Sequence, residues 1–198
     1  MSSMPFEVVE DGSITTPRGF RAAGLYCGLK KSERNDLGAV FCGVPAAAAG
    51  VYTTNVFQAA PLAVTRSSLA VEGRLQAVVV NSGNANACTG KQGEDDALKM
   101  RAAAARAFGI PEHYVGIAST GVIGELLPMD KIEAGIARLP ERLSVDGSED
   151  FCQAILTTDL VKKTVCVKVT VDGRPVHIAG AAKGSGMIHP NMATMLGF

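Results

Sequence analysis

The sequence predicts a layered α/β fold, because short apolar segments alternate with amphipathic helical segments along the chain and the composition is rich in small residues. Glycine occurs 22 times, tryptophan is absent and aromatic residues make up 5%. Such a composition suits backbones that pack closely between layers. The 198 residues, 47% of them hydrophobic, fall within the size of one ordinary domain or part of one.

The first half of the chain contains two predicted strands and a predicted helix. Residues 37–44 and 75–80 are short, apolar and partly β-branched, which is typical of buried strands. Pro61 predicts an irregular connection between them. Residues 94–108 place their apolar side chains on one helical face, and Gly109 follows as a stop signal.

The second half begins with two further predicted helices. Asp130 and Glu133 have the spacing of a capping box, so a helix is expected to begin there and to end at Pro140. Another helix is expected to start at Ser148. These helices follow a short apolar strand predicted at 115–118.

A hairpin and a glycine-rich segment close the chain. Residues 164–171 alternate valine with polar side chains or cysteine, and Asp172-Gly173 supplies a two-residue turn. The returning strand carries Val176 and Ile178. It leads into residues 180–198, which are too irregular for a helix and too apolar for a linker, so this segment is a candidate for a functional site.

Charge and hydropathy narrow the classes of partner. Lysine and arginine together number 19 and so do aspartate and glutamate, so no net field attracts nucleic acid or an anionic membrane. No apolar run is long enough to span a membrane, and the opening residues lack the pattern of a signal peptide. We expect a soluble cytoplasmic protein that binds small molecules or another subunit.

Metal and nucleotide cofactors are not expected. The five cysteines form no C-x-x-C pair, and the three histidines lie far apart. Lys183 precedes Gly184 and Gly186 rather than following a glycine loop, so the phosphate-binding motif fails, and the dinucleotide fingerprint lacks its third glycine. The cysteines are expected to be reduced.

Residues 182–196, AKGSGMIHPNMATML, closely resemble the autocleavage segment of the ornithine acetyltransferases, also called glutamate N-acetyltransferases. Further blocks of that family occur in the same order: AAGVYTTN at 48–55, NSGNANACTG at 81–90, STGVIGELLP at 119–128 and AILTTD at 154–159. The resemblance covers nearly the whole chain. It implies the layered α/β fold of the ornithine acetyltransferase type, in an autoprocessing enzyme that resembles the N-terminal-nucleophile enzymes.

The resemblance places the scissile bond between Ala193 and Thr194. Residues 1–193 would then be the α segment, and residues 194–198 the start of a β segment whose remainder is absent. Cleavage would make Thr194 an N-terminal nucleophile, because its own α-amine, with a reference pKa of about 7.7–8.0, can serve as the general base.

The resemblance also implies roles for other residues of the site. Thr120 and Gly121 would form the oxyanion site, although an ordinary turn after a strand would give the same sequence. Thr157 and Lys183 would contact substrate; a lysine suits a carboxylate, and a solvated surface lysine is the alternative. The residues after Asp159 depart from the usual family pattern, which affects the details near Thr157.

The resemblance implies transfer of the acetyl group from N2-acetyl-L-ornithine to L-glutamate through an acetyl-threonine, in arginine biosynthesis and without a cofactor. The partner would be the chain's own β segment, in an α2β2 heterotetramer. Two alternatives stay open: an N-terminal-nucleophile amidohydrolase or aminopeptidase, and a non-catalytic binding module. Use of acetyl-CoA as a second donor is also left open.

Overall fold

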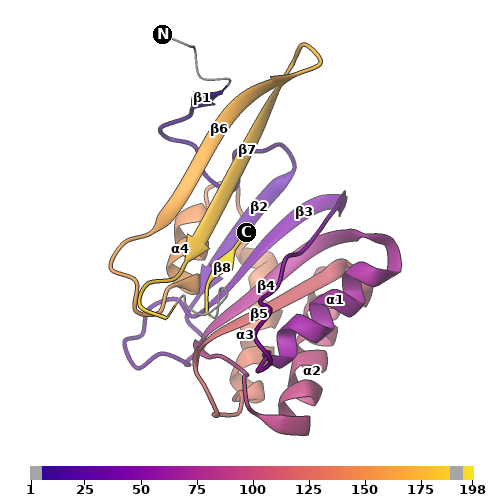
Figure 1. Cartoon of the computed structure of the whole chain (residues 1–198), viewed down its shortest axis with the longest axis vertical. Helices are drawn as coiled ribbons and strands as arrows, with labels where there is room; N and C mark the ends of the chain where they lie inside the picture. The colour runs from indigo at the N-terminus through magenta and orange to yellow at the C-terminus, as the bar shows by residue number, and fades with distance from the viewer. Residues whose placement is uncertain (1–5, 188–193) are drawn as a thin grey trace.

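A computed structural model of the chain describes residues 6–187 and 194–198. Two four-stranded sheets make up its frame (Figure 1). The first sheet has the order β2 (Phe20–Leu25), β3 (Leu37–Ala47), β4 (Arg74–Asn84) and β5 (Val115–Val122). The second has the order β1 (Glu7–Val8), β6 (Lys163–Val171), β7 (Arg174–Lys183) and β8 (Leu196–Gly197).

Four α-helices pack against these sheets: α1 (Ala60–Glu72), α2 (Gly90–Phe108), α3 (Met129–Arg142) and α4 (Ser148–Ile155). A short 3₁₀ helix, η1 (Glu112–Tyr114), leads into β5. Within the described part of the chain, no helix combines the length and the apolar character needed to cross a membrane.

The first sheet has a core on each face, because successive side chains of a strand point to opposite sides. Val79 packs into the larger core with helices α2 and α3, whereas its neighbour Val80 packs into a smaller core with Phe151 of α4. Ala181 of β7 and Phe198 join that smaller core. Helix α4 therefore lies between the first sheet and the β6–β7 hairpin, which extends beyond the body of the domain (Figure 1).

Strands β2, β3 and β4 are antiparallel, but β4 and β5 are parallel. A parallel pair requires a long crossover, and here α2 and η1 provide it. The carboxyl ends of β4 and β5 consequently meet at one edge of the sheet, where Ser82 lies opposite Thr120 and Gly83 opposite Gly121.

The α/β class and most of the expected elements are confirmed. Helix α2 ends at Gly109, which adopts a left-handed conformation with φ 66°. Asp172 and Gly173 both have positive φ, as a two-residue hairpin turn requires. The strand expected at 164–171 and its returning partner form β6 and β7, and the return continues through Lys183.

Several local expectations are wrong. Helix α3 begins at Met129 after Pro128, and no side chain caps its first turn, so Asp130 does not form a capping box. Pro140 does not end α3, because it lies in the last turn, where its missing N–H removes a single helical hydrogen bond. Pro61 lies in the first turn of α1, where proline is well tolerated.

The contact between α4 and β2 depends on Gly24. A Cβ atom at Gly24 would lie 2.0 Å from the Asp150 carbonyl oxygen, so Gly24→Ala must displace the helix. We expect the free energy of unfolding to fall by about 1–3 kcal/mol or more in urea denaturation. Gly43→Ala in β3 is the control, because its Cβ would meet nothing closer than 4.0 Å. Equal stability of the two variants would contradict the packing described.

Candidate functional site

Lys183, the last residue of β7, lies at the centre of a polar cluster. The residue is 4% exposed. Its Nζ donates hydrogen bonds to Thr157 Oγ1 at 2.7 Å and to Thr120 Oγ1 at 3.1 Å. Three of the residues predicted from the sequence therefore meet, although they come from β7, from the loop after α4 and from β5.

Thr120 and Gly121 lie inside β5, so the alternative that they form an ordinary turn is wrong. Gly121 has φ +133°, and a Cβ there would lie 2.2 Å from the Gly83 carbonyl oxygen. Only glycine allows β5 to pass β4 so closely. The Thr120 side chain, which is 1% exposed, is thereby held next to Lys183.

The loop that carries Thr157 is fixed by the end of α4. Ser82 of β4 donates its hydroxyl hydrogen bond to the Ala154 carbonyl oxygen, close to the point where the helix ends at Ile155. The short step from Ile155 to Thr157 then brings the threonine hydroxyl to Lys183. Strand β4 thus positions Thr157 through α4, as it positions Thr120 through β5.

Asp159 is a further member of the cluster that was not named as a site residue from the sequence. Its side chain has no solvent exposure. Oδ1 accepts hydrogen bonds from Gly184 N at 2.8 Å and from Lys163 Nζ at 2.6 Å, while Oδ2 has no partner in the described part of the chain. The carboxylate fixes the backbone immediately after Lys183.

Burial by itself would raise the pKa of Asp159, but the hydrogen bonds from Lys163 and from the Gly184 amide outweigh burial and hold the pKa below its usual value. Asp159 is therefore ionised at neutral pH. The AILTTD block was the signal in the sequence that could have identified it.

Lys183 has no carboxylate oxygen within 4 Å of its Nζ among residues 6–187 and 194–198. Burial lowers the pKa of Lys183, the charge of Asp159 raises it and the charge of Lys163 lowers it further. Burying a cation without an ion pair is unfavourable. The positive charge of Lys183 is therefore available to an anionic group that enters the site.

Thr194 lies on the segment that returns to β7. Its backbone N–H donates to the Met187 carbonyl oxygen at 2.5 Å, and the residue is half-buried. Two residues later Leu196 pairs with Lys183, so β8 runs beside the end of β7. Ala193, the other side of the predicted scissile bond, lies outside the described residues.

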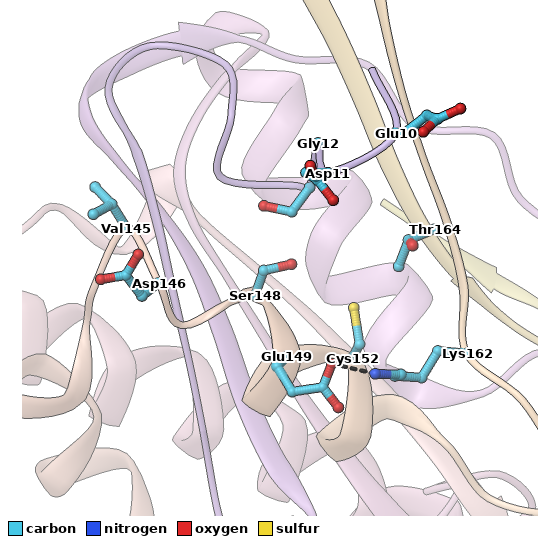
Figure 2. A pocket seen from close by; sticks show the side chains of 11 residues that line it. Glu10, Asp11, Gly12, Val145, Asp146, Ser148, Glu149, Cys152, Lys162 and Thr164 are labelled. Carbon is cyan, nitrogen blue, oxygen red and sulfur yellow. Dashed lines mark hydrogen bonds and ion pairs between the residues drawn. The ribbon is translucent and has the colours of Figure 1, made fainter. Parts of the chain in front are cut away.

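Two cavities flank α4. One, of about 380 Å³, is drawn in Figure 2 and is lined by Cys152 and the acidic side chains Glu10, Asp11, Asp146 and Glu149. Burial raises the pKa of the Cys152 thiol, which therefore stays protonated. In the part of the chain that the structure describes, no three histidine, cysteine, aspartate or glutamate side chains are placed to hold a metal ion.

The second cavity is a cleft of about 590 Å³, and Thr157 is one of its lining residues. Glu149 and Lys162 line both cavities and form an ion pair between them (Figure 2). Of the two, only the cleft adjoins the cluster of Lys183, Thr120 and Thr157.

Curated relatives match almost all of this chain. It is 60% identical over 190 residues to the arginine biosynthesis bifunctional protein ArgJ of Bacillus anthracis and 58% identical to that of Halalkalibacterium halodurans. Each match covers 96% of this chain and 46% of the relative. The chain thus spans about half the length of these curated relatives.

Solved structures share the fold. The crystal structure of the arginine biosynthesis bifunctional protein from Bacillus halodurans has a TM-score of 0.91 and 55% identity, covering 96% of this chain and 98% of that one. The ornithine acetyltransferase of Mycobacterium tuberculosis, complexed with ornithine, has a TM-score of 0.87 and 39% identity, covering 96% of this chain and 100% of that one. Residues 21–198 match the ArgJ family, and the chain belongs to that family.

Proposed function

We propose that this chain is the N-terminal part of an autoprocessing acetyltransferase that moves the acetyl group of N2-acetylornithine to glutamate. Family membership supports the reaction class, and the name of the Mycobacterium tuberculosis structure supports ornithine as a ligand. The observation that supports the proposal best is the buried cation of Lys183, which has no ion pair among residues 6–187 and 194–198. Thr120 and Thr157 hold it beside the strand that follows Thr194.

Autocleavage comes first in the proposed sequence. Thr194 Oγ attacks the Ala193 carbonyl carbon, the peptide bond breaks, and an ester joins the two segments. Water then hydrolyses the ester and leaves Thr194 with a free α-amine. A hydroxyl is a weak nucleophile at neutral pH, so the new amine supplies the base that the later chemistry requires.

In the first acetyl transfer, the α-amine of Thr194 takes the proton of Oγ as Oγ attacks the acetyl carbonyl. The tetrahedral intermediate collapses to acetyl-threonine, and the proton passes to the departing amine of ornithine. Glutamate then attacks the ester with its own amine, gives up a proton, and leaves as acetylglutamate with the Thr194 hydroxyl restored. Donor and acceptor use one nucleophile in turn, and no cofactor is needed.

Thr120 and Gly121 are proposed to stabilise the oxyanion. A threonine hydroxyl has one proton and two lone pairs. Because the Thr120 oxygen already accepts from Lys183, its proton remains available to donate. Gly121 can present a backbone N–H from a conformation that other residues adopt rarely. Lys183 and Thr157 are proposed to hold the substrate carboxylate.

The rest of the protein is proposed to be its own β segment, in an α2β2 assembly. The β6–β7 hairpin has apolar side chains in solvent, with Val165 55%, Val176 39% and Ile178 55% exposed. The cross-strand pairing places these three side chains on one face of the hairpin, and exposed apolar side chains on one face favour a covering partner. The relatives are named bifunctional, which supports a second activity; acetyl-CoA as an alternative donor would use the same Thr194.

Variants of the full-length protein at Thr194 show whether this residue acts as a nucleophile or has only a structural role. Thr194→Ala should remain uncut and transfer no acetyl group, because it lacks Oγ. Thr194→Ser should cut slowly and retain part of the activity, because it keeps Oγ and the amine but lacks the methyl group that restricts the rotamer. Intact-mass spectrometry and an ornithine-release assay provide the readouts. Thr170→Ala, an exposed threonine of β6, is the control; normal processing of Thr194→Ala would refute the mechanism.

Lys183→Met tests the substrate contact. Methionine fills the space of the lysine stem without its charge, and removal of a buried cation that has no ion pair in the described residues should leave the fold intact. We expect the KM for acetylornithine to rise about tenfold or more, the usual effect of losing a hydrogen bond to a charged group. Lys168→Met on β6 removes an exposed lysine and should leave KM unchanged. If the two variants behave alike, Lys183 does not contact substrate.

A further inference from the structure

The cleft beside Thr157 has an unusual charge distribution. Three cationic side chains line it, Lys30, Arg34 and Lys162, together with one acidic side chain, Glu149. Glu149 is already engaged, since it accepts hydrogen bonds from Lys162 and from Gln153. Lys30 and Arg34 therefore leave the cleft with an excess of positive charge.

Lys30 carries more of the argument than Arg34, because Lys30 is half-buried whereas Arg34 is exposed. Its Nζ donates to the Asn35 carbonyl oxygen at 2.6 Å and approaches the Gln153 carbonyl oxygen at 3.5 Å. In the described part of the chain, no carboxylate oxygen lies within 4 Å of it. Partial burial of this ammonium group is unfavourable, and an anion that reaches it would offset that cost.

Asp36 is a buried acid whose charge acts on Lys30, but its carboxylate accepts hydrogen bonds from the backbone. Its oxygens accept hydrogen bonds from the N–H groups of Cys27 at 2.7 Å, Leu29 at 2.6 Å and Lys30 at 3.0 Å. These bonds fix the loop that presents Lys30. The pKa of Lys30 is lowered to about 8. Burial is the largest cause, and the charges of Arg34 and Lys183 act in the same direction, whereas the charge of Asp36 opposes them.

Thr157 connects the cleft with the site. Its hydroxyl accepts from Lys183, and the same residue lines the cleft. An amino acid whose α-carboxylate is held at Lys183 could therefore extend its side chain past Thr157. The two proposed substrates differ there, because glutamate ends in a carboxylate and ornithine in an ammonium group.

On the basis of the function proposed above, we propose that Lys30 and Arg34 form the subsite for the side-chain carboxylate of glutamate. The cationic side chains of the cleft match the carboxylate of glutamate. Among the lining residues, the one carboxylate, that of Glu149, is already paired with Lys162, so none is free to bind the ammonium group of ornithine. Lys30 would thus determine specificity for the acceptor, while Lys183 serves both substrates.

Half-reactions of the processed full-length protein test this assignment. Labelled ornithine exchanges into acetylornithine without glutamate, and labelled glutamate exchanges into acetylglutamate without ornithine. For Lys30→Met we expect the KM of the glutamate exchange to rise about tenfold or more, with the ornithine exchange near wild type. Lys30→Arg should recover part of the glutamate exchange. Lys31→Met, an exposed neighbour, is the matched control and should not change either exchange.

Thermal unfolding separates binding from folding. Lys30→Met should be at least as stable as the wild type, because it removes a half-buried cation that has no ion pair in the part of the chain that the structure describes. Equal effects on both exchanges, or no effect on either, would overturn the assignment of Lys30 while leaving the acetyl-transfer function in place. Absence of ornithine exchange in the wild type would refute the proposed function itself, and the subsite with it.

As the pH rises past about 8, Lys30 loses its charge. The wild type should then bind glutamate more weakly, whereas Lys30→Arg should not, because arginine stays charged. The KM for glutamate of the wild type, divided by the KM for glutamate of Lys30→Arg, should therefore increase. The same ratio for ornithine should stay constant, which controls for titration of the Thr194 amine and of the substrate amines. A constant glutamate ratio would contradict the role of the Lys30 charge.

Discussion

The site depends on one interaction above all: the ammonium group of Lys183 is buried at the end of β7 between two threonine hydroxyls and has no ion pair in the described residues. Thr120 and Thr157 can accept from it only if β5 and α4 end at the same place. Strand β4 brings the two ends together, because it pairs with β5 along its length and holds the end of α4 through Ser82. Asp159 then fixes the backbone after Lys183 through Gly184.

Glycine at close contacts makes this geometry accessible. Gly121 lets β5 run against Gly83 of β4, and Gly24 lets β2 approach the backbone of α4. Each contact would be broken by a single methyl group, so the sheet positions the site only because these positions lack a Cβ atom. The abundance of glycine in the sequence thus has a structural cause at these positions.

The sequence predicted the elements with strong local signals. The valine alternation of β6 and the apolar face of α2 are recognisable because their burial follows a fixed period. Strand β2 and helix α1 were missed because their signals are weak: β2 is rich in small residues, and in α1 only Pro61, Val64 and Ser68 are buried. Pro61 in particular suggested a break, although it occupies a first turn.

The site residues became apparent from the sequence only through family resemblance. Lys183 is 63 residues from Thr120 and 26 from Thr157, and no local pattern links such distant positions. Asp159 contacts Gly184, 25 residues away, so its neighbours in the sequence do not reveal that contact, although it stands in one of the family blocks. The roles of Thr194 and of the Ala193–Thr194 bond stay predictions, since the structure shows the position of Thr194 but not its chemistry.

The most direct test of the central claim is to trap the acetyl group on the enzyme. The processed full-length protein would be mixed with acetylornithine in the absence of glutamate, quenched in acid and mapped by peptide mass spectrometry. We expect one acetyl group on the Thr194 hydroxyl, bound as an ester that hydroxylamine removes and that glutamate discharges. An acetyl group on another residue, or continued transfer with none on Thr194, would contradict it.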